Sequence, residues 1–221
     1  MSGQRAAWRS ETHIGWHPRA IEWWTCCLFM VGSLCFALGS LPGYASLVDP
    51  AVVGGTFFVG SIFFTSAALL QFVQARTRVD WWASLIQLVG TVWFNINTYD
   101  ALHTGLDAHE ENLRIFTPDF IGSICFLVSS WMAYAVVCGR PFGIERGRTD
   151  WWISAANLLG SVFFMAAAFA AFVLPSTDNL LDASLANSGT LAGALCFFWA
   201  ARLQVTRSVR RSGPAWRPCS E

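Results

Sequence analysis

The chain has 221 residues, of which 54% are hydrophobic and only 13% are charged, whereas an ordinary soluble domain has about a quarter charged residues. Because the apolar residues also gather in long blocks, this composition excludes an ordinary water-soluble domain. The formal net charge is zero, with 14 basic residues, all arginine, and 14 acidic residues, so no overall field attracts nucleic acid.

The apolar blocks are long enough to cross the hydrocarbon core of a bilayer as helices. A membrane β-barrel is not expected, because the blocks are continuously apolar instead of alternating, and helices pair their own backbone polar groups in lipid. The predicted fold class is therefore an all-α, polytopic membrane bundle of six transmembrane helices. The predicted spans are 22–41, 51–74, 81–102, 117–138, 151–173 and 187–206.

Two polar segments flank the predicted transmembrane domain, which covers residues 21–206. The N-terminal arm, residues 1–20, contains arginines with Trp8, Trp16, His13 and His17, a composition typical of a segment lying on a membrane surface. The arginine-rich tail, residues 207–221, is expected to contact anionic lipid. The predicted partners are thus the lipid bilayer and its anionic lipids, with no nucleic acid; self-association is left open.

Arginines are distributed unevenly between the two sides of the predicted membrane domain. All of them except Arg114 precede the first block, lie near the end of the last block or after it, or lie between the second and third or the fourth and fifth blocks. The other connections carry acidic residues such as Asp107 and Glu110. Because arginine accumulates on the cytoplasmic side, we expect a multi-pass protein of the bacterial inner membrane with both termini in the cytoplasm.

An internal repeat divides the chain into three tandem two-helix hairpins, about 21–75, 79–138 and 149–206. Each hairpin begins with a tryptophan pair, expected to anchor at the membrane interface. A glycine follows nine residues after the first tryptophan, at Gly32, Gly90 and Gly160. The second helices repeat a glycine at Gly60, Gly122 and Gly193. Such small residues let helix backbones approach closely in lipid.

The second block contains Gly55-Thr56-Phe57-Phe58-Val59-Gly60-Ser61-Ile62-Phe63-Phe64, with aromatic residues on both sides of a glycine-serine pair. This run resembles the second helix of YrhK-like membrane domains, and Gly32-Ser33-Leu34-Cys35-Phe36 looks like the matching first-helix element. The resemblance covers the first hairpin clearly and the other two more loosely, since Ala194 replaces serine in the third. The resemblance implies a hairpin architecture like that of many small uncharacterised bacterial membrane proteins. It implies no catalytic residues for this chain.

The third block carries a polar stripe at steps of three or four residues, which places its members on one helical face. The fifth block repeats the stripe with fewer polar residues, so we expect these two blocks to line most of the bundle centre. The stripe has two interpretations, a path for a neutral or weakly polar solute or hydrogen bonding between helices. The candidate path residues are Ser84, Gln87, Thr91, Asn95, Asn157 and Ser161.

The connection between the third and fourth blocks is rich in potential metal ligands, namely His103, Asp107, His109 and Glu110. Nitrogen and oxygen ligands of this kind suit zinc or another divalent cation. The spacing matches no established metal motif, so a solvated acidic loop is the alternative interpretation.

The apolar blocks contain few groups that could perform acid, base or nucleophilic chemistry. We therefore expect a small-solute channel, carrier or sensor component rather than an enzyme, and the sequence identifies no cofactor. The alternative function is a membrane enzyme or metal-handling protein that uses the His103–Glu111 loop.

Overall fold

The computed structural model describes residues 20–103, 106–177 and 179–212. These residues form long helices joined by short elements, so the predicted all-α class is confirmed. The connecting elements are α2 (Pro42–Ala45), α5 (Ala108–Glu111), a π-helical turn (Asn112–Phe116) and the strands β1 (Val173–Leu174) and β2 (Asn179–Leu180). The long helices are α1 (Ile21–Gly39), α3 (Pro50–Val73), α4 (Arg78–Asp100), α6 (Thr117–Cys138), α7 (Thr149–Ala170) and α8 (Ala183–Ser212).

Four helical segments among the described residues are long and apolar enough to cross a membrane. They are Ile21–Gly39, Pro50–Val73, Ala108–Cys138 and Thr149–Ala170. The helices α4 and α8 have comparable or greater length but are more polar, since α4 contains Gln87 and Asn95 and α8 contains Arg202 and Arg207. Polarity, and not length, therefore sets these two helices apart.

Several helix ends differ from the predicted spans. The helix α4 ends at Asp100 and α7 at Ala170, both before the predicted ends, whereas α8 continues to Ser212. Helical structure thus extends into the segment predicted as an arginine-rich tail. Residues 1–19 of the predicted N-terminal arm and 213–221 of the tail lie outside the described residues.

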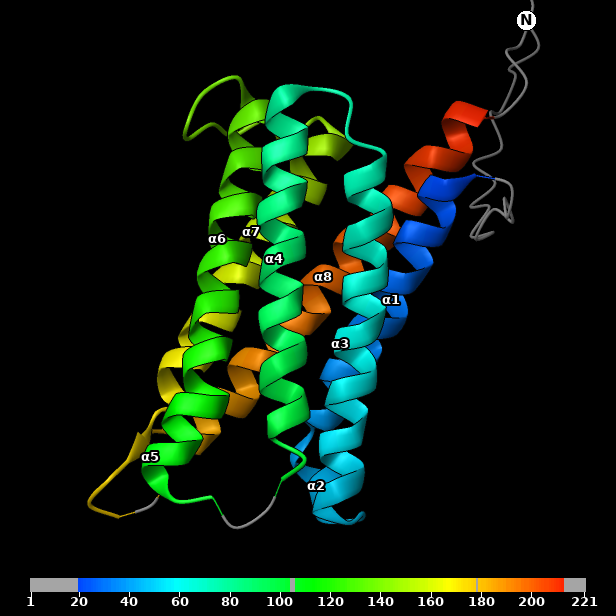
Figure 1. Cartoon of the computed structure of the whole chain (residues 1–221). Helices are drawn as coiled ribbons and strands as arrows, with labels where there is room; N and C mark the ends of the chain where they lie inside the picture. Colours follow the sequence, from blue (N-terminus) through cyan, green and yellow to red (C-terminus); the bar gives the residue numbers. More distant parts are fainter. Residues whose placement is uncertain (1–19, 104–105, 178, 213–221) are drawn as a thin grey trace, which may run out of the picture.

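The long helices form a closed ring, because each packs against two neighbours in the order α1, α3, α4, α6, α7, α8 and back to α1. In Figure 1, α1 begins and α8 ends at the same end of the bundle as the α3–α4 and α6–α7 connections, whereas α2 and α5 lie at the opposite end. We name these the arginine end, after Arg76, Arg140 and Arg148, and the acidic end, after Asp100 and Asp107.

The helix pairs α1–α3, α4–α6 and α7–α8 each approach most closely where a glycine of one helix faces a glycine of the other. A Cβ atom added at Gly90 would lie 2.8 Å from Cys125 Cβ and 3.1 Å from the Gly122 carbonyl oxygen. Backbones this close leave no space for a side chain at the crossing point. The facing pairs are Gly32 with Gly60, Gly90 with Gly122, and Gly160 with Gly193.

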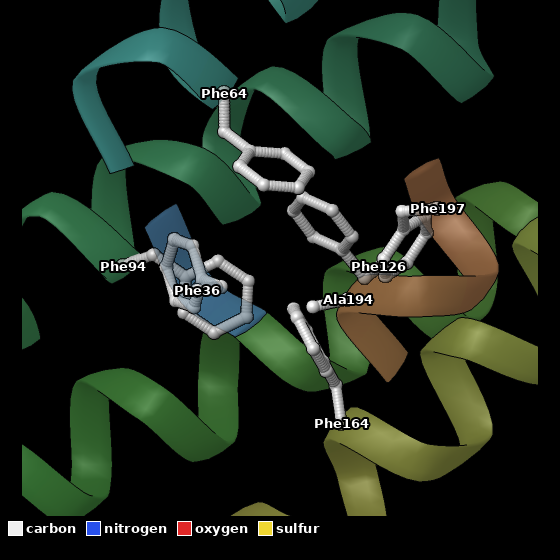
Figure 2. Packing of buried hydrophobic residues seen from close by; sticks show 7 residues of the cluster. All are labelled: Phe36, Phe64, Phe94, Phe126, Phe164, Ala194 and Phe197. Carbon is white, nitrogen blue, oxygen red and sulfur yellow. The ribbon is translucent and has the colours of Figure 1, made fainter. Parts of the chain in front are cut away.

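Phenylalanine side chains fill the centre of the ring, and each long helix contributes one of them. Their rings meet at edge-to-face and tilted angles, with centroids 5.0 Å apart for Phe94–Phe126 and 5.2 Å for Phe164–Phe197. The prediction that α4 and α7 line most of the bundle centre is wrong where these rings lie, because each of the long helices contributes one ring. We name the cluster the phenylalanine layer (Figure 2): Phe36, Phe64, Phe94, Phe126, Phe164 and Phe197.

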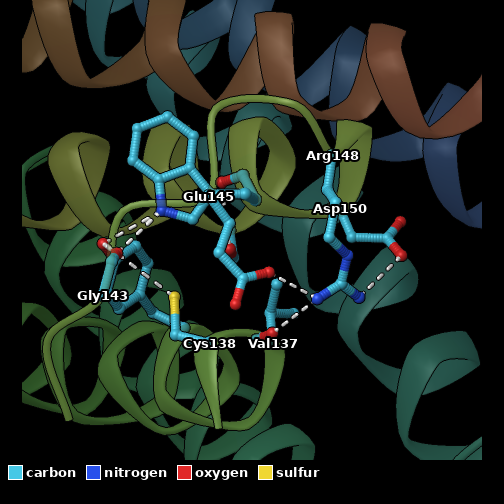
Figure 3. Close-up of polar contacts among 9 residues, drawn as sticks. Val137, Cys138, Gly143, Glu145, Arg148 and Asp150 are labelled. Carbon is cyan, nitrogen blue, oxygen red and sulfur yellow. Dashed lines mark hydrogen bonds and ion pairs between the residues drawn. The ribbon is translucent and has the colours of Figure 1, made fainter. Parts of the chain in front are cut away.

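The connection between α6 and α7 is fastened at the arginine end (Figure 3). The Gly143 carbonyl oxygen accepts hydrogen bonds from the Tyr134 hydroxyl and from the Trp151 indole nitrogen, the latter at 3.0 Å. Asp150, near the start of α7, forms an ion pair with Arg207 of α8 at 2.8 Å. These contacts hold the beginning of α7 against both α6 and α8.

The same contacts correct part of the prediction about the tryptophan pairs. Trp151 is 9% exposed and Trp23 is 6% exposed, so the first tryptophan of two pairs packs inside the bundle. Trp24 and Trp152 are each 46% exposed, which suits an interfacial anchor. The prediction is therefore wrong for Trp23 and Trp151, whose rings pack against other helices, whereas both tryptophans of the α4 pair are exposed, Trp81 at 41% and Trp82 at 46%.

Candidate functional site

A polar chamber of about 80 Å³ lies on the arginine-end side of the phenylalanine layer. All the long helices contribute to its wall, and Phe197 belongs both to this wall and to the layer. The chamber therefore borders the phenylalanine layer at Phe197. The wall residues that matter most for binding are Phe29, Gln71, Gln87, Asn157, Phe197 and Gln204.

A wider vestibule of about 680 Å³ adjoins the chamber. The two spaces share Gln71, Ala83, Ala133 and Gln204 in their walls, so they lie next to each other. The vestibule also reaches Arg76, in the connection between α3 and α4, which places its mouth at the arginine end. The vestibule thus lies between the arginine end and the wall of the chamber.

The four carboxamides of the chamber occupy equivalent positions in the long helices. Gln87 and Asn157 each lie three residues before the facing glycine of their helix, and Gln71 and Gln204 each lie eleven residues after it. Phe29 and Ala133 hold the corresponding positions in α1 and α6. The amides therefore surround the bundle axis at one level.

These amides lack hydrogen-bond partners within the part of the chain that the structure describes. Gln74, one turn beyond Gln71, shows the contrast, since its side-chain nitrogen donates to the Thr25 hydroxyl at 2.9 Å and to the Leu70 carbonyl at 2.7 Å. The side chains of Gln71, Gln87, Asn157 and Gln204 border the chamber instead. Among the described residues, the fully buried side-chain N and O atoms without a partner are the Ser33 and Ser123 hydroxyls. The four amides are therefore accessible, and a molecule in the chamber can form hydrogen bonds with them.

Of the predicted path residues, Gln87 and Asn157 line the chamber and Ser84 lines the vestibule. The Ser84 hydroxyl is already used, because it donates to the Asp80 carbonyl at 2.6 Å. The two amides are thus the members of the predicted stripe that remain available to a solute.

The other three predicted path residues lie in packed contacts between helices. Asn95 donates to the Thr65 hydroxyl at 2.9 Å, and the Ser161 and Ser130 hydroxyls are 2.8 Å apart. Thr91 is fully buried and donates to the Leu88 carbonyl at 2.7 Å. The structure therefore divides the stripe, with helix packing at Thr91, Asn95 and Ser161 and solute-accessible amides at Gln87 and Asn157.

The predicted metal ligands lie at the acidic end. Asp107 and Glu110 cap the start of α5, where each carboxylate accepts a hydrogen bond from the backbone of the other residue, at 2.8 Å and 3.3 Å. His103 and His109 are exposed. Among the described residues, no three His, Cys, Asp or Glu side chains are placed to hold one metal ion. The metal site therefore stays a prediction that no arrangement of these side chains supports.

Sequence reasoning missed Gln71 and Gln204, which lie outside the polar stripe predicted for the third and fifth blocks. Their spacing of eleven residues after Gly60 and Gly193 is the signal that could have identified them as a pair. The phenylalanine layer also has a signal, because a phenylalanine follows each facing glycine by four residues in every long helix.

Comparisons with known proteins add no family to this description, since no family model, no curated protein and no solved structure matches the chain. The resemblance to YrhK-like domains stays a prediction. The geometry of the chamber therefore carries the functional argument.

Proposed function

We propose that the protein is a membrane carrier for a small uncharged polar solute, which binds in the chamber. The observation that carries this proposal is the set of four unpaired amides around one enclosed space. Polar residues inside a membrane bundle cost free energy unless they face protein or water, and those without protein partners commonly bind a substrate. The binding residues of the proposal are Gln71, Gln87, Asn157 and Gln204.

The proposal includes α4 and α8 as the third and sixth of six membrane spans, arranged as three tandem hairpins. Both helices belong to the same closed ring as the four candidate spans. The polar residues of α4 are compatible with a membrane span, because Gln87 lines the chamber and Thr91 is fully buried, so neither side chain has to face lipid. The facing glycines in each hairpin and the resemblance to YrhK-like domains support the same arrangement.

The phenylalanine layer favours a carrier over an open channel. Phe126 is 1% exposed and Phe64 is 2% exposed, so the rings leave no continuous path along the bundle axis. A carrier binds its solute on one side of such a closure and then opens on the other side. The structure corresponds, in this proposal, to the form that is open at the arginine end.

The arginine end faces the cytoplasm in this proposal, because arginine is retained on that side of the bacterial inner membrane. Exposed arginines there, such as Arg76 and Arg140, would also contact anionic lipid headgroups. The chamber wall has no charged residue. An ion would lose its hydration without gaining an opposite charge, so an uncharged solute is favoured.

The test is solute flux into liposomes that contain the purified protein. Osmotic shrinkage and recovery are followed by light scattering for a panel of small uncharged solutes, namely urea, acetamide, ethylene glycol and glycerol. We expect at least one of these to enter faster than into protein-free liposomes, and Gln87→Met to slow that entry by about tenfold. Methionine has a similar shape to glutamine but lacks the amide.

The matched control is Thr190→Val, which removes a polar group from α8 at a hydroxyl that donates to the Ala186 carbonyl at 2.7 Å, away from the chamber. Flux through this variant should equal that of the wild type. If none of the four solutes enters faster than into protein-free liposomes, or if Gln87→Met and Thr190→Val slow entry equally, the proposed function is wrong.

A further inference from the structure

We infer that the solute is a small, planar, uncharged amide of the urea class. This inference rests on the proposed function and specifies its substrate. It follows from the kind of hydrogen-bonding group in the chamber, from the aromatic rings beside these groups and from the chamber volume.

The free hydrogen-bonding groups of the chamber are all carboxamides. Each of Gln71, Gln87, Asn157 and Gln204 offers two N–H donors and one carbonyl acceptor in a single plane. The two serine hydroxyls in the wall are already engaged, since Ser129 donates to the Phe126 carbonyl at 3.1 Å and Ser130 pairs with Ser161. A ligand that presents N–H groups next to a carbonyl matches this set, because one amide can pair with another through both kinds of group.

Aromatic rings complete the chamber wall. Phe29 and Phe197 line it together with the amides, and both belong to the packed aromatic core, with the Phe29 ring centroid 5.6 Å from that of Phe64. The faces of such rings favour flat partners, whose edges then remain free for hydrogen bonding. A planar amide can therefore use both the rings and the carboxamides, whereas a bent polyol can use only the latter.

The volume limits the ligand to a few non-hydrogen atoms. The chamber measures about 80 Å³, a small fraction of the volume of the vestibule beside it. Urea and acetamide suit this space. Larger amides would have to displace side chains or remain in the vestibule, whose volume is about 680 Å³.

The test compares urea with ethylene glycol in liposomes that contain the full-length protein. The two solutes have the same number of non-hydrogen atoms and no charge, but only urea is planar and amide-like. We expect the protein-dependent entry of urea to exceed that of ethylene glycol by about tenfold, because a site built to pair N–H and C=O groups discriminates against a solute without them. Gln87→Met and Gln204→Met should each reduce this ratio, whereas Thr190→Val should leave it unchanged.

The use of two variants guards against the failure of one of them to fold. If ethylene glycol or glycerol enters in a Gln87-dependent manner and urea does not, the amide class is wrong while the carrier function stands. If urea enters faster but neither Gln87→Met nor Gln204→Met changes the urea to ethylene glycol ratio, the assignment of these amides is overturned. If no solute enters in a protein-dependent manner, the proposed function itself fails.

Discussion

Phe126→Ala is expected to lower the free energy of unfolding by about 3–5 kcal/mol, the usual range for truncating a fully buried phenylalanine. The Phe126 side chain is 1% exposed, and its ring packs against Phe64, Phe94 and Phe197, with centroids 6.2 Å, 5.0 Å and 5.7 Å away. Neighbours fixed by the facing glycines cannot collapse into the space. Denaturant unfolding of the protein in detergent micelles measures this change.

Leu195→Ala provides the matched control for Phe126→Ala. Leu195 is 52% exposed on α8, two residues before Phe197 of the phenylalanine layer. In the proposed bundle this side chain faces lipid, which fills the space left by its truncation, so the expected loss is below about 1 kcal/mol. Equal losses for the two variants would show that the phenylalanine layer is not the packed centre of the protein.

The phenylalanine layer also predicts a change in permeability for the same variant. Removal of the Phe126 ring opens space between the chamber and the acidic half of the bundle. The proposed seal should then leak, so that urea and ethylene glycol enter liposomes at similar rates.

Gly90→Ala is expected to destabilise the protein by about 1–3 kcal/mol, the usual cost of forcing an extra carbon into a packed site. The added Cβ atom would lie 2.8 Å from Cys125 Cβ and 3.1 Å from the Gly122 carbonyl oxygen. Because the second contact is with backbone, the helices α4 and α6 must move apart to relieve it. Thermal unfolding in detergent checks the direction and the size of the change.

Gly55→Ala is the control for this glycine effect, and the expected sign is opposite. Gly55 lies inside α3, and nothing is within 4 Å of a Cβ atom added there. Alanine forms helix more readily than glycine by up to about 1 kcal/mol, so the variant should be unchanged or more stable. A loss of stability at Gly55 as large as that at Gly90 would contradict the assigned packing.

The positions of the long helices could be predicted from the sequence, because their apolar blocks are long and are separated by polar connections. A helix overlaps each of the predicted spans, and the facing glycines were identified from their regular spacing. The ends were less predictable. The apolar residues Phe172 and Val173 extended the predicted fifth span, yet Val173 lies in β1, where its backbone pairs with the side-chain amide of Asn112 at 2.7 Å and 2.8 Å.

The chamber could be predicted only in part, because a helical periodicity identifies a face but not the depth at which that face is packed. Gln87 and Asn95 belong to the same predicted stripe, but Gln87 lines the chamber, whereas Asn95 directly follows Phe94 and lies at the level of the phenylalanine layer. Asn95 finds a partner in Thr65 of the neighbouring helix. The distinction depends on residues of other helices, which no spacing within α4 reveals.

The most direct test of the proposed carrier is the accessibility of the chamber from each side of the membrane. A small, membrane-impermeant thiol reagent is applied to Gln87→Cys in right-side-out and inside-out membrane vesicles, with the unsubstituted protein as the baseline for its own cysteines. We expect modification above this baseline to be faster from the cytoplasmic side, because the vestibule lies between the arginine end and the chamber wall and the phenylalanine layer closes the other side in this form. Modification from neither side, or faster modification from the opposite side, would contradict a cytoplasm-facing chamber closed by the phenylalanine layer.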